Sequence, residues 1–273
     1  MKPERTYQLN FSDFRPAMLD FEGRRRKAAT MVSVLSDYFE YCLSPVVPLQ
    51  RLRVLDIGGS TGIIDEYLSR YFGSVTGIDI DTKAVRFASE TFDRGNLYFH
   101  PGDAMKLAVR DETVDVVICS QVYEHVPDAR KMIDEIYRVL RPGSVCYFAA
   151  STRLMWNEPH YSLPLLSVVP RRIAHWYIRM AGKADCYHEL HLFSWELKQL
   201  VSRFKIVDYT RKIIVNPDQF KTSYLFPPGS TKTRLARLVA DRLYWAMPGY
   251  IWLLKKPGTF AVQQDIPGDV WQA

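Results

Sequence analysis

Short apolar runs alternate with longer amphipathic stretches through the first 150 residues of the chain. Five runs rich in leucine, isoleucine, valine and aromatic residues have the length of strands, at residues 52–58, 74–80, 96–100, 114–120 and 144–150. Between them, apolar positions recur every three or four residues, which predicts helices over 62–72, 82–92 and 128–140. The same spacing predicts a helix over 22–41, ahead of the first strand. Alternating strands and helices of this kind favour a parallel sheet with helical crossovers.

The pattern changes after residue 150. An irregular segment, 151–193, precedes a predicted helix at 194–203 and a strand at 204–210, and a second one, 216–248, precedes a final strand at 250–257. We therefore expect an α/β fold, a doubly wound Rossmann-like domain whose mostly parallel seven-stranded sheet has helices on both faces. Lid-like insertions follow its fifth and sixth strands. The expected organisation is a helical extension (1–50), a cofactor-binding core (51–150), a C-terminal half of the same domain (151–257) and a tail (258–273).

Composition narrows the class of protein. Apolar residues make up 47% of the 273 residues, enough for a full core, and the net charge of +6 permits anionic partners. No secretory leader and no apolar run of about 18 residues is evident, so we expect a cytoplasmic protein. The four cysteines are far apart and lack metal-ligand spacing, which predicts reduced thiols and no zinc: Cys42, Cys119, Cys146 and Cys186.

The turn after the first strand, "VLDIGGSTG" at 54–62, contains three glycines, so much of its backbone is bare of side chains. In an open α/β sheet this turn is the usual ligand contact. Its glycines do not have the spacing of a dinucleotide-binding fingerprint, and the Gly-Lys-Ser/Thr ending of a phosphate-binding loop is missing. The turn therefore suits a nucleoside that carries no pyrophosphate.

The same turn resembles the first motif, D-x-G-x-G-x-G, of the class I S-adenosylmethionine-dependent methyltransferases, of the type 11-like group. Asp56, Gly58 and Gly62 match it, whereas Ser60 replaces the middle glycine, and we expect Gly59 to take up the turn instead. The resemblance implies that S-adenosyl-L-methionine is the cofactor and that this loop holds its methionine end. The free N–H groups at the start of the next helix suit a carboxylate.

Other strand ends extend the resemblance in a fixed order. It implies cofactor contacts from Asp79 and Ile80 near the ribose, Asp103 and Ala104 near the adenine, and Ser120 and Gln121 beside the methyl-transfer site. Each feature on its own has a structural explanation. Each acid could be a solvated residue at a strand end or a helix cap, and the glycines could form an ordinary tight loop. Their order and spacing over about a hundred residues favour the methyltransferase interpretation.

A hydroxyl acceptor needs a base, because methylation leaves its proton to be removed. His125 follows the fourth strand, His160 follows the fifth, and His188 lies just before the helix at 194–203. We expect the base to be His160 or His188, with Glu158 or Glu189 to orient it.

Two other chemistries have less support in the sequence. The spacing of His188 and His191 is compatible with metal ligands, but no third ligand with a suitable pattern accompanies them, so no metal is expected. The Asn/Asp-Pro-Pro-aromatic string of enzymes that methylate planar amines is replaced by Ser-Gln-Val-Tyr at 120–123. Methylation of a planar amine is therefore disfavoured, which leaves hydroxyl or, less often, carbon and flexible amine acceptors.

Both insertions contain basic, aromatic-rich stretches, at 163–183 and 231–252. Such stretches are typical of contact with anionic lipid, although the apolar stripe at 235–245 could equally pack on the domain. The favoured function is O-methylation of a small-molecule, lipid or lipid-linked glycan acceptor, with peripheral contact at the inner face of a membrane. The alternatives are an RNA methyltransferase with a basic lid and a non-catalytic cofactor-binding interaction protein; nucleic acid is the less expected partner.

Overall fold

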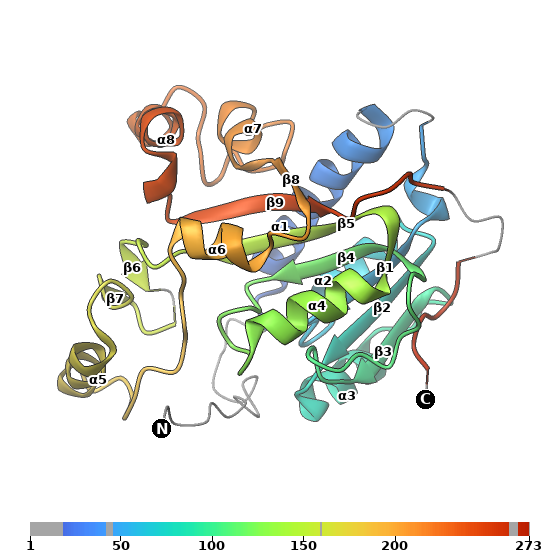
Figure 1. Ribbon diagram of the computed structural model, residues 1–273, viewed down its shortest axis with the longest axis horizontal. Helices are drawn as coiled ribbons and strands as arrows, with labels where there is room; N and C mark the ends of the chain where they lie inside the picture. Colours follow the sequence, from blue (N-terminus) through green and yellow to red (C-terminus); the bar gives the residue numbers. More distant parts are fainter. Residues whose placement is uncertain (1–18, 42–45, 159, 262–266, 273) are drawn as a thin grey trace.

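A seven-stranded sheet organises the chain in a computed structural model that describes residues 19–41, 46–158, 160–261 and 267–272. Cys42 therefore lies outside the described residues. The strand order is β3-β2-β1-β4-β5-β9-β8 (Figure 1). The five strands β1 to β5 are parallel, whereas β9 is antiparallel to both β5 and β8. The strands are β1 (Arg53–Ile57), β2 (Ser74–Asp79), β3 (Leu97–Pro101), β4 (Val114–Ser120), β5 (Leu140–Ser151), β8 (Lys205–Asp208) and β9 (Gly249–Lys255). The predicted fold class is confirmed.

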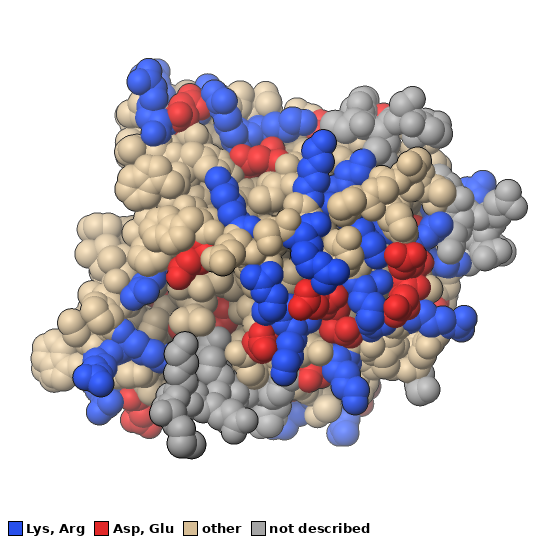
Figure 2. Space-filling model, in the orientation of Figure 1, with Lys and Arg blue, Asp and Glu red and all other residues tan. Residues whose placement is uncertain are grey.

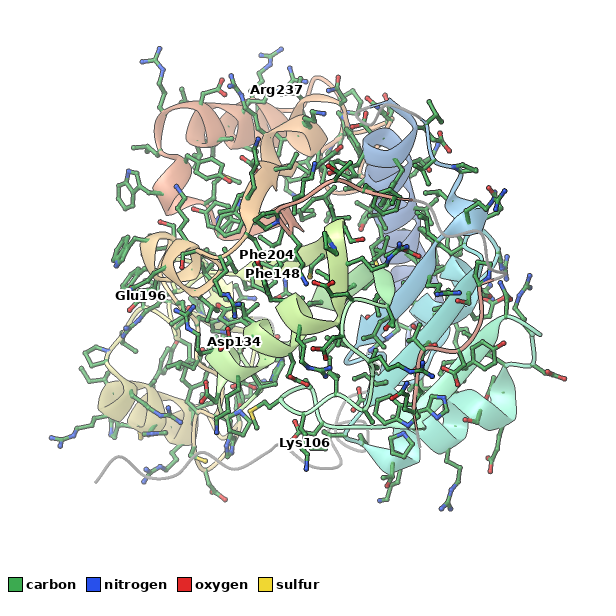
Figure 3. All side chains as sticks on the ribbon, turned by 45° about the vertical axis from the view of Figure 1, so that its right-hand side comes forward. Lys106, Asp134, Phe148, Glu196, Phe204 and Arg237 are labelled. Atoms are coloured by element: carbon green, nitrogen blue, oxygen red, sulfur yellow. The ribbon has the colours of Figure 1, made fainter. Side chains whose placement is uncertain are left out.

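Helices cover both faces of this sheet. On one face α4 (Ala129–Val139) and α6 (Ser194–Leu200) share a core with the strands, and its members Phe148 and Phe204 are labelled in Figure 3. On the other face α1 (Phe21–Ser36), α2 (Ile63–Leu68) and α7 (Thr210–Val215) contribute to a second core. Helix α3 (Thr82–Thr91) lies against β2 and β3. Because β1, β4 and β5 are covered on both sides, their residues are almost all buried.

Several element bounds differ from the predicted ones: β5 begins four residues early, at Leu140, and α2 and α6 end early, at Leu68 and Leu200. The first helix ends at Ser36 and continues as a π-helical turn, Asp37–Tyr41. The strand expected at 204–210 ends at Asp208, because the Asp208 side chain accepts a hydrogen bond from the Thr210 N–H at 2.9 Å and the chain turns there into α7.

The two insertions lie on the same edge of the molecule (Figure 1). The first contains a two-stranded hairpin, β6 (Asn157–Glu158) and β7 (Leu163–Pro164), and helix α5 (Arg171–Met180). The second contains α8 (Thr231–Arg242) and a short 3-10 turn, Tyr244–Ala246. Within the described residues, no helix combines the length and apolarity needed to span a bilayer.

Candidate active site

The glycine turn after β1 is fixed by backbone hydrogen bonds to the neighbouring strand. The N–H groups of Gly58 and Gly59 both donate to the Ile78 carbonyl, at 2.9 and 3.0 Å. Gly58 and Gly62 have positive φ angles of 77° and 71°. A Cβ at Gly62 would lie 2.7 Å from the Phe99 ring, so the turn has no room for a side chain there. The bare backbone is therefore a steric requirement of this loop.

Ser60 itself takes up the turn, and the expectation that Gly59 does so is wrong. Ser60 has φ 55°, whereas Gly59 is not among the residues with positive φ. The strain is offset because the Ser60 N–H donates to Asp79 Oδ2 at 2.9 Å. Gly59 is needed for a different reason: a Cβ there would lie 2.7 Å from Asp65 Oδ2.

Asp79 at the end of β2 is held in place by the chain on both sides of it. Its Oδ2 accepts from Ser60 and its Oδ1 accepts from the Asp81 N–H at 2.8 Å. Burial raises the pKa of Asp79, and these two backbone hydrogen bonds oppose the rise. Ile80, next to it, is half-buried. A carboxylate fixed in this way has lone pairs left for the two hydroxyls of a ribose, and contact of Asp79 with the ribose stays a prediction.

The adenine side of the predicted site is a tight turn after β3. Asp103 Oδ1 accepts from the Met105 N–H at 2.7 Å, and Ala104 lies inside the turn, packed against the core. The backbone of this turn is therefore ordered by Asp103 itself. Contact of either residue with adenine stays a prediction.

Sequence reasoning missed two charged residues at the cofactor end, Arg24 and Asp65. Burial raises the pKa of Asp65 to about 7, and it also raises the pKa of Asp56, which faces it. Arg24 on α1 interacts with the charges of both carboxylates and of Asp79. A signal was present for Arg24, because it precedes the buried Ala28 by four residues and so shares its face of the helix.

The segment after β4 connects the sheet to the first insertion. β4 ends at Ser120, and the Gln121 side chain accepts from the Ser151 hydroxyl at 2.6 Å. The Tyr123 hydroxyl donates to the Ser151 carbonyl at 2.6 Å and accepts from the Leu192 N–H at 3.1 Å. Ser120 and Gln121 therefore lie where the ends of β4 and β5 meet the insertion.

This segment also meets the cofactor loop. A Cβ at Gly58 would lie 2.8 Å from a methyl carbon of Val122. The His125 N–H donates to the Val122 carbonyl at 2.9 Å, and the Leu190 N–H donates to the Glu124 carbonyl at 3.1 Å. Residues 121–125 thus link the glycine turn to the insertion that carries the other predicted catalytic residues.

His160, one of the two residues favoured as the base, forms a close pair with Glu158. Its Nδ1 lies 2.5 Å from Glu158 Oε1, and its ring centroid lies 4.9 Å from that of His125, nearly perpendicular to it. His191 Nε2 lies 3.7 Å from the same Glu158 oxygen. Burial alone would raise the pKa of Glu158, but the contacts with His160 and His191 outweigh it and lower the pKa to about 2. Glu158 is therefore an ionised partner for these histidines.

Two further buried glutamates face this pair. Glu189 Oε1 lies 4.0 Å from His160 Nδ1, and the side-chain oxygens of Glu189 and Glu124 have no hydrogen-bond partner among the described residues. Burial raises the pKa of Glu124 to about 8, and the charges of Glu189 and Glu158 add to the rise. Glu124 is therefore protonated at pH 7. We call this group the Glu/His cluster: Glu124, His125, Glu158, His160, Glu189 and His191.

His188, the other residue favoured as the base, is not part of the Glu/His cluster. It is exposed, and its Nε2 lies 2.9 Å from Cys186 Sγ. The structure instead places His191 in the cluster, one residue beyond Leu190. A repeated Glu-x-His spacing, 158–160 and 189–191, was the sequence signal for this arrangement.

Nitrogen and oxygen atoms of the Glu/His cluster are also close enough to be considered as metal ligands. Those of His125, His160 and Glu189 lie within 4.8 Å of one another, as do those of Glu158, His160 and His191. The argument that no third ligand accompanies the histidines therefore fails in three dimensions. The absence of a metal stays a prediction.

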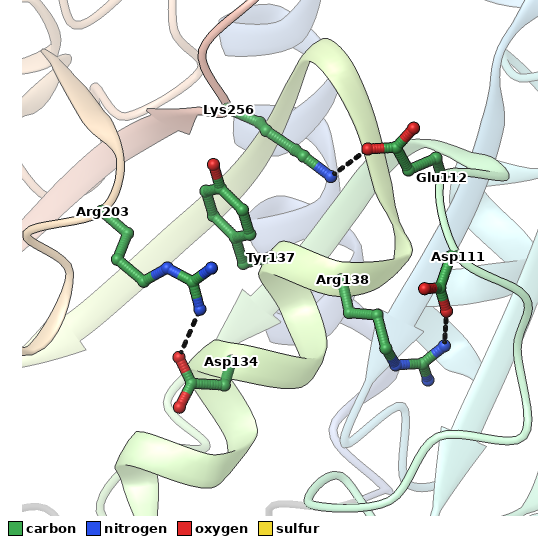
Figure 4. A pocket seen from close by; sticks show the side chains of 7 residues that line it. All are labelled: Asp111, Glu112, Asp134, Tyr137, Arg138, Arg203 and Lys256. Atoms are coloured by element: carbon green, nitrogen blue, oxygen red, sulfur yellow. Dashed lines mark hydrogen bonds and ion pairs between the residues drawn. The ribbon is translucent and has the colours of Figure 1, made fainter.

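A separate polar pocket lies at the opposite end of the sheet (Figure 4). Its residues come from the chain just before β4, the end of α4, the chain between α6 and β8, and the chain after β9. The charged groups in it are paired: Lys256 with Glu112 at 2.9 Å, Arg203 with Asp134 at 2.8 Å, and Arg138 with Asp111 at 2.6 Å. It is distant from the strand ends that carry the glycine turn, and we assign it no role.

The strand order, the bare turn at 56–62 and the acid at the end of β2 agree with the expected resemblance to the class I S-adenosylmethionine-dependent methyltransferases. Residues 55–148 match a family described as a methyltransferase domain. The fold is also that of an S-adenosylmethionine-dependent methyltransferase from Mesorhizobium loti, at 13% identity and a TM-score of 0.53 over 86% of this chain and 99% of the other. Residues 55–148 are therefore a methyltransferase domain of the kind that uses S-adenosylmethionine as its cofactor.

Curated relatives match part of the chain. A ubiquinone biosynthesis O-methyltransferase from Psychrobacter cryohalolentis is 36% identical over 107 residues, which are 37% of this chain and 41% of that protein. One of the same name from Albidiferax ferrireducens is 30% identical over 147 residues, 52% of this chain and 57% of that protein. The chain thus spans about half the length of the curated relatives it matches.

Proposed function

We propose that this protein transfers the methyl group of S-adenosylmethionine to a hydroxyl oxygen of a small-molecule or lipid acceptor, with His160 as the general base. The observation that carries the proposal is the pair formed by His160 and the ionised Glu158, next to His125 and to the segment that touches the glycine turn. A histidine oriented by a buried carboxylate is a common arrangement for a general base.

The roles of the residues follow from this pairing. When bound, S-adenosylmethionine supplies an activated methyl group on its sulfonium. Glu158 accepts a hydrogen bond from His160 Nδ1–H, and His160 Nε2 takes the acceptor's hydroxyl proton. The oxygen–carbon bond forms as the carbon–sulfur bond breaks, and the proton ends on His160. Glu158 stabilises the resulting imidazolium through its negative charge.

Two further observations support an oxygen acceptor. At the end of β4, Gln121 and Val122 stand where enzymes that methylate planar amines have two prolines. Two of the curated relatives that match part of the chain are named ubiquinone biosynthesis O-methyltransferases. Their names describe those proteins, and they favour an apolar hydroxyl acceptor here.

The proposal is tested by methyl transfer from labelled S-adenosylmethionine to fractionated lipid, glycan and RNA extracts of the source organism. We expect label in a hydroxyl-bearing lipid or small-molecule fraction. His160→Ala should lower kcat by at least about 100-fold, and Glu158→Gln by a smaller factor. Neither change should alter binding of S-adenosylhomocysteine, measured by calorimetry.

His188→Ala is the matched control, because this exposed histidine comes from the same insertion but lies outside the Glu/His cluster. It should keep at least half of the activity. Label in RNA alone would contradict the proposed acceptor, and full activity in His160→Ala would contradict the proposed base.

A further inference from the structure

Helix α5 in the first insertion is apolar on its solvent side. Ala174 and Ile178 are buried in a small separate core, whereas Ile173, Trp176 and Met180 are exposed, Trp176 by 63%. Large apolar side chains that gather on one exposed helix indicate a binding surface.

Helix α8 in the second insertion has the same character. Its inward positions are small residues, Thr233 and Ala240, while Leu235 and Leu238 are 61% and 56% exposed. The alternative that the apolar stripe packs on the domain therefore fails for these leucines. Leu243 and Trp245, which follow α8, are also about half exposed. Only Val239 of the predicted stripe packs against the core.

Tryptophans mark the same edge of the molecule. Four of the six tryptophans are strongly exposed: Trp156, Trp176, Trp195 and Trp245. They come from the first insertion, α5, α6 and the turn after α8, and these elements lie along one edge in both ribbon views (Figures 1 and 3). Tryptophan is the residue type that concentrates at the boundary between lipid and water.

Basic side chains flank this apolar edge. Helix α5 has no acidic residue, and Arg171, Arg172 and Arg179 are all exposed. On α8 the exposed basic residues outnumber the single acid, Asp241, which forms an ion pair with Arg211. In Figure 2 the same edge is mostly uncharged over its middle, with basic groups near its upper and lower ends. Positive charge around an apolar centre complements a surface that is apolar within and negatively charged at its boundary.

We propose that this edge, the membrane face, binds the surface of a bilayer that contains anionic lipids. We define the membrane face by its exposed residues: Trp156, Arg172, Ile173, Trp176, Arg179, Met180, Trp195, Arg234, Leu235, Leu238, Leu243 and Trp245. The tryptophans and leucines insert among the headgroups while the arginines contact lipid phosphates. The face adjoins the insertion that carries Glu158 and His160, so an acceptor dissolved in the bilayer would be presented close to the base.

The purpose of membrane binding, to bring an acceptor to the base, rests on the proposed function. The binding itself does not, since it is measured without cofactor or acceptor. The experiment is co-sedimentation of the full chain with vesicles of phosphatidylcholine alone and with about a third phosphatidylglycerol. We expect binding to the anionic vesicles, a blue shift of tryptophan fluorescence, and at least about a tenfold loss of binding at high salt.

Variants separate the two contributions. Trp176→Ser with Trp245→Ser should abolish most of the binding and reduce the fluorescence shift accordingly. Arg172→Glu with Arg234→Glu should weaken binding to anionic vesicles by at least about tenfold. Val46→Ser and Arg51→Glu are matched controls, because both residues are exposed just before β1 and outside the membrane face. Both variants should bind vesicles like the wild type.

Three results would overturn the proposal. The first is no binding to anionic vesicles at low salt. The second is binding that the tryptophan and arginine variants leave unchanged. The third is a wild-type dimer in solution that the tryptophan variants convert to a monomer without any effect on vesicles, because the face would then cover a second copy of the chain.

Discussion

The cofactor end and the acceptor end of this site are built by different means. At the cofactor end, backbone groups of the glycine turn bond to the next strand and to Asp79. At the acceptor end, side chains from three separate segments come together: His125 after β4, Glu158 and His160 early in the first insertion, and Glu189 and His191 at its end. The comparison shows why the cofactor end carries a recognisable motif: a turn made of backbone needs particular residues at fixed spacing. A cluster made of side chains needs only that distant segments fold together.

Among these variants, Asp79→Ala should have the largest effect, a loss of ligand affinity at the cofactor end. The change removes the carboxylate expected to accept the ribose hydroxyls, and it also releases the Ser60 N–H that fixes the turn. We expect affinity for S-adenosylhomocysteine to fall by at least about 100-fold, since hydrogen bonds to a charged group contribute about 1.5–3 kcal/mol each. Calorimetry measures the dissociation constant.

Asp93→Ala is the control for that loss, because Asp93 is exposed after α3. Its affinity should equal that of the wild type. An Asp79→Ala protein that still binds the ligand tightly would show that the cofactor end is not organised around this acid.

Asp65→Asn should have a smaller effect than Asp79→Ala, which is to stabilise the protein at alkaline pH. Because the pKa of Asp65 is raised from 3.8 to about 7 in the folded state, the free energy of unfolding falls as the pH rises between these values. An asparagine stays neutral and its amide can donate to Asp56. We expect a gain on the order of 2 kcal/mol at pH 8 and little at pH 4, from urea denaturation.

Glu90→Gln provides the comparison for Asp65→Asn, since it changes an exposed carboxylate on the neighbouring helix α3. Its stability should follow that of the wild type at both pH values. A loss of stability in Asp65→Asn at pH 8 would mean that the ionised carboxylate is favourable in the fold.

Chelation of metal ions should have the smallest effect. It distinguishes a histidine base from a metal centre at the acceptor end. If His160 acts as a base paired with Glu158, dialysis against EDTA should leave kcat within about a factor of two, because no step needs a Lewis acid. Methyl transfer to the labelled acceptor fraction is the measurement. Lost activity that a divalent cation restores would instead make the Glu/His cluster a metal centre.

The sequence by itself determined the sheet, its cofactor turn and the residues expected around the cofactor, because strand periodicity and turn chemistry act over short distances. It also placed His160 and Glu158 among the candidates, and it flagged the basic amphipathic stretches. It did not separate His160 from His188, or reveal the roles of Arg24 and Asp65.

Only the tertiary structure decided those points, for a physical reason. Whether a histidine is buried beside a glutamate or exposed beside a cysteine depends on how the first insertion folds back over the end of β4, and no local pattern records that path. The same holds for α8, whose leucines could have faced either way. Its small residues pack inward, so the leucines remain in solvent.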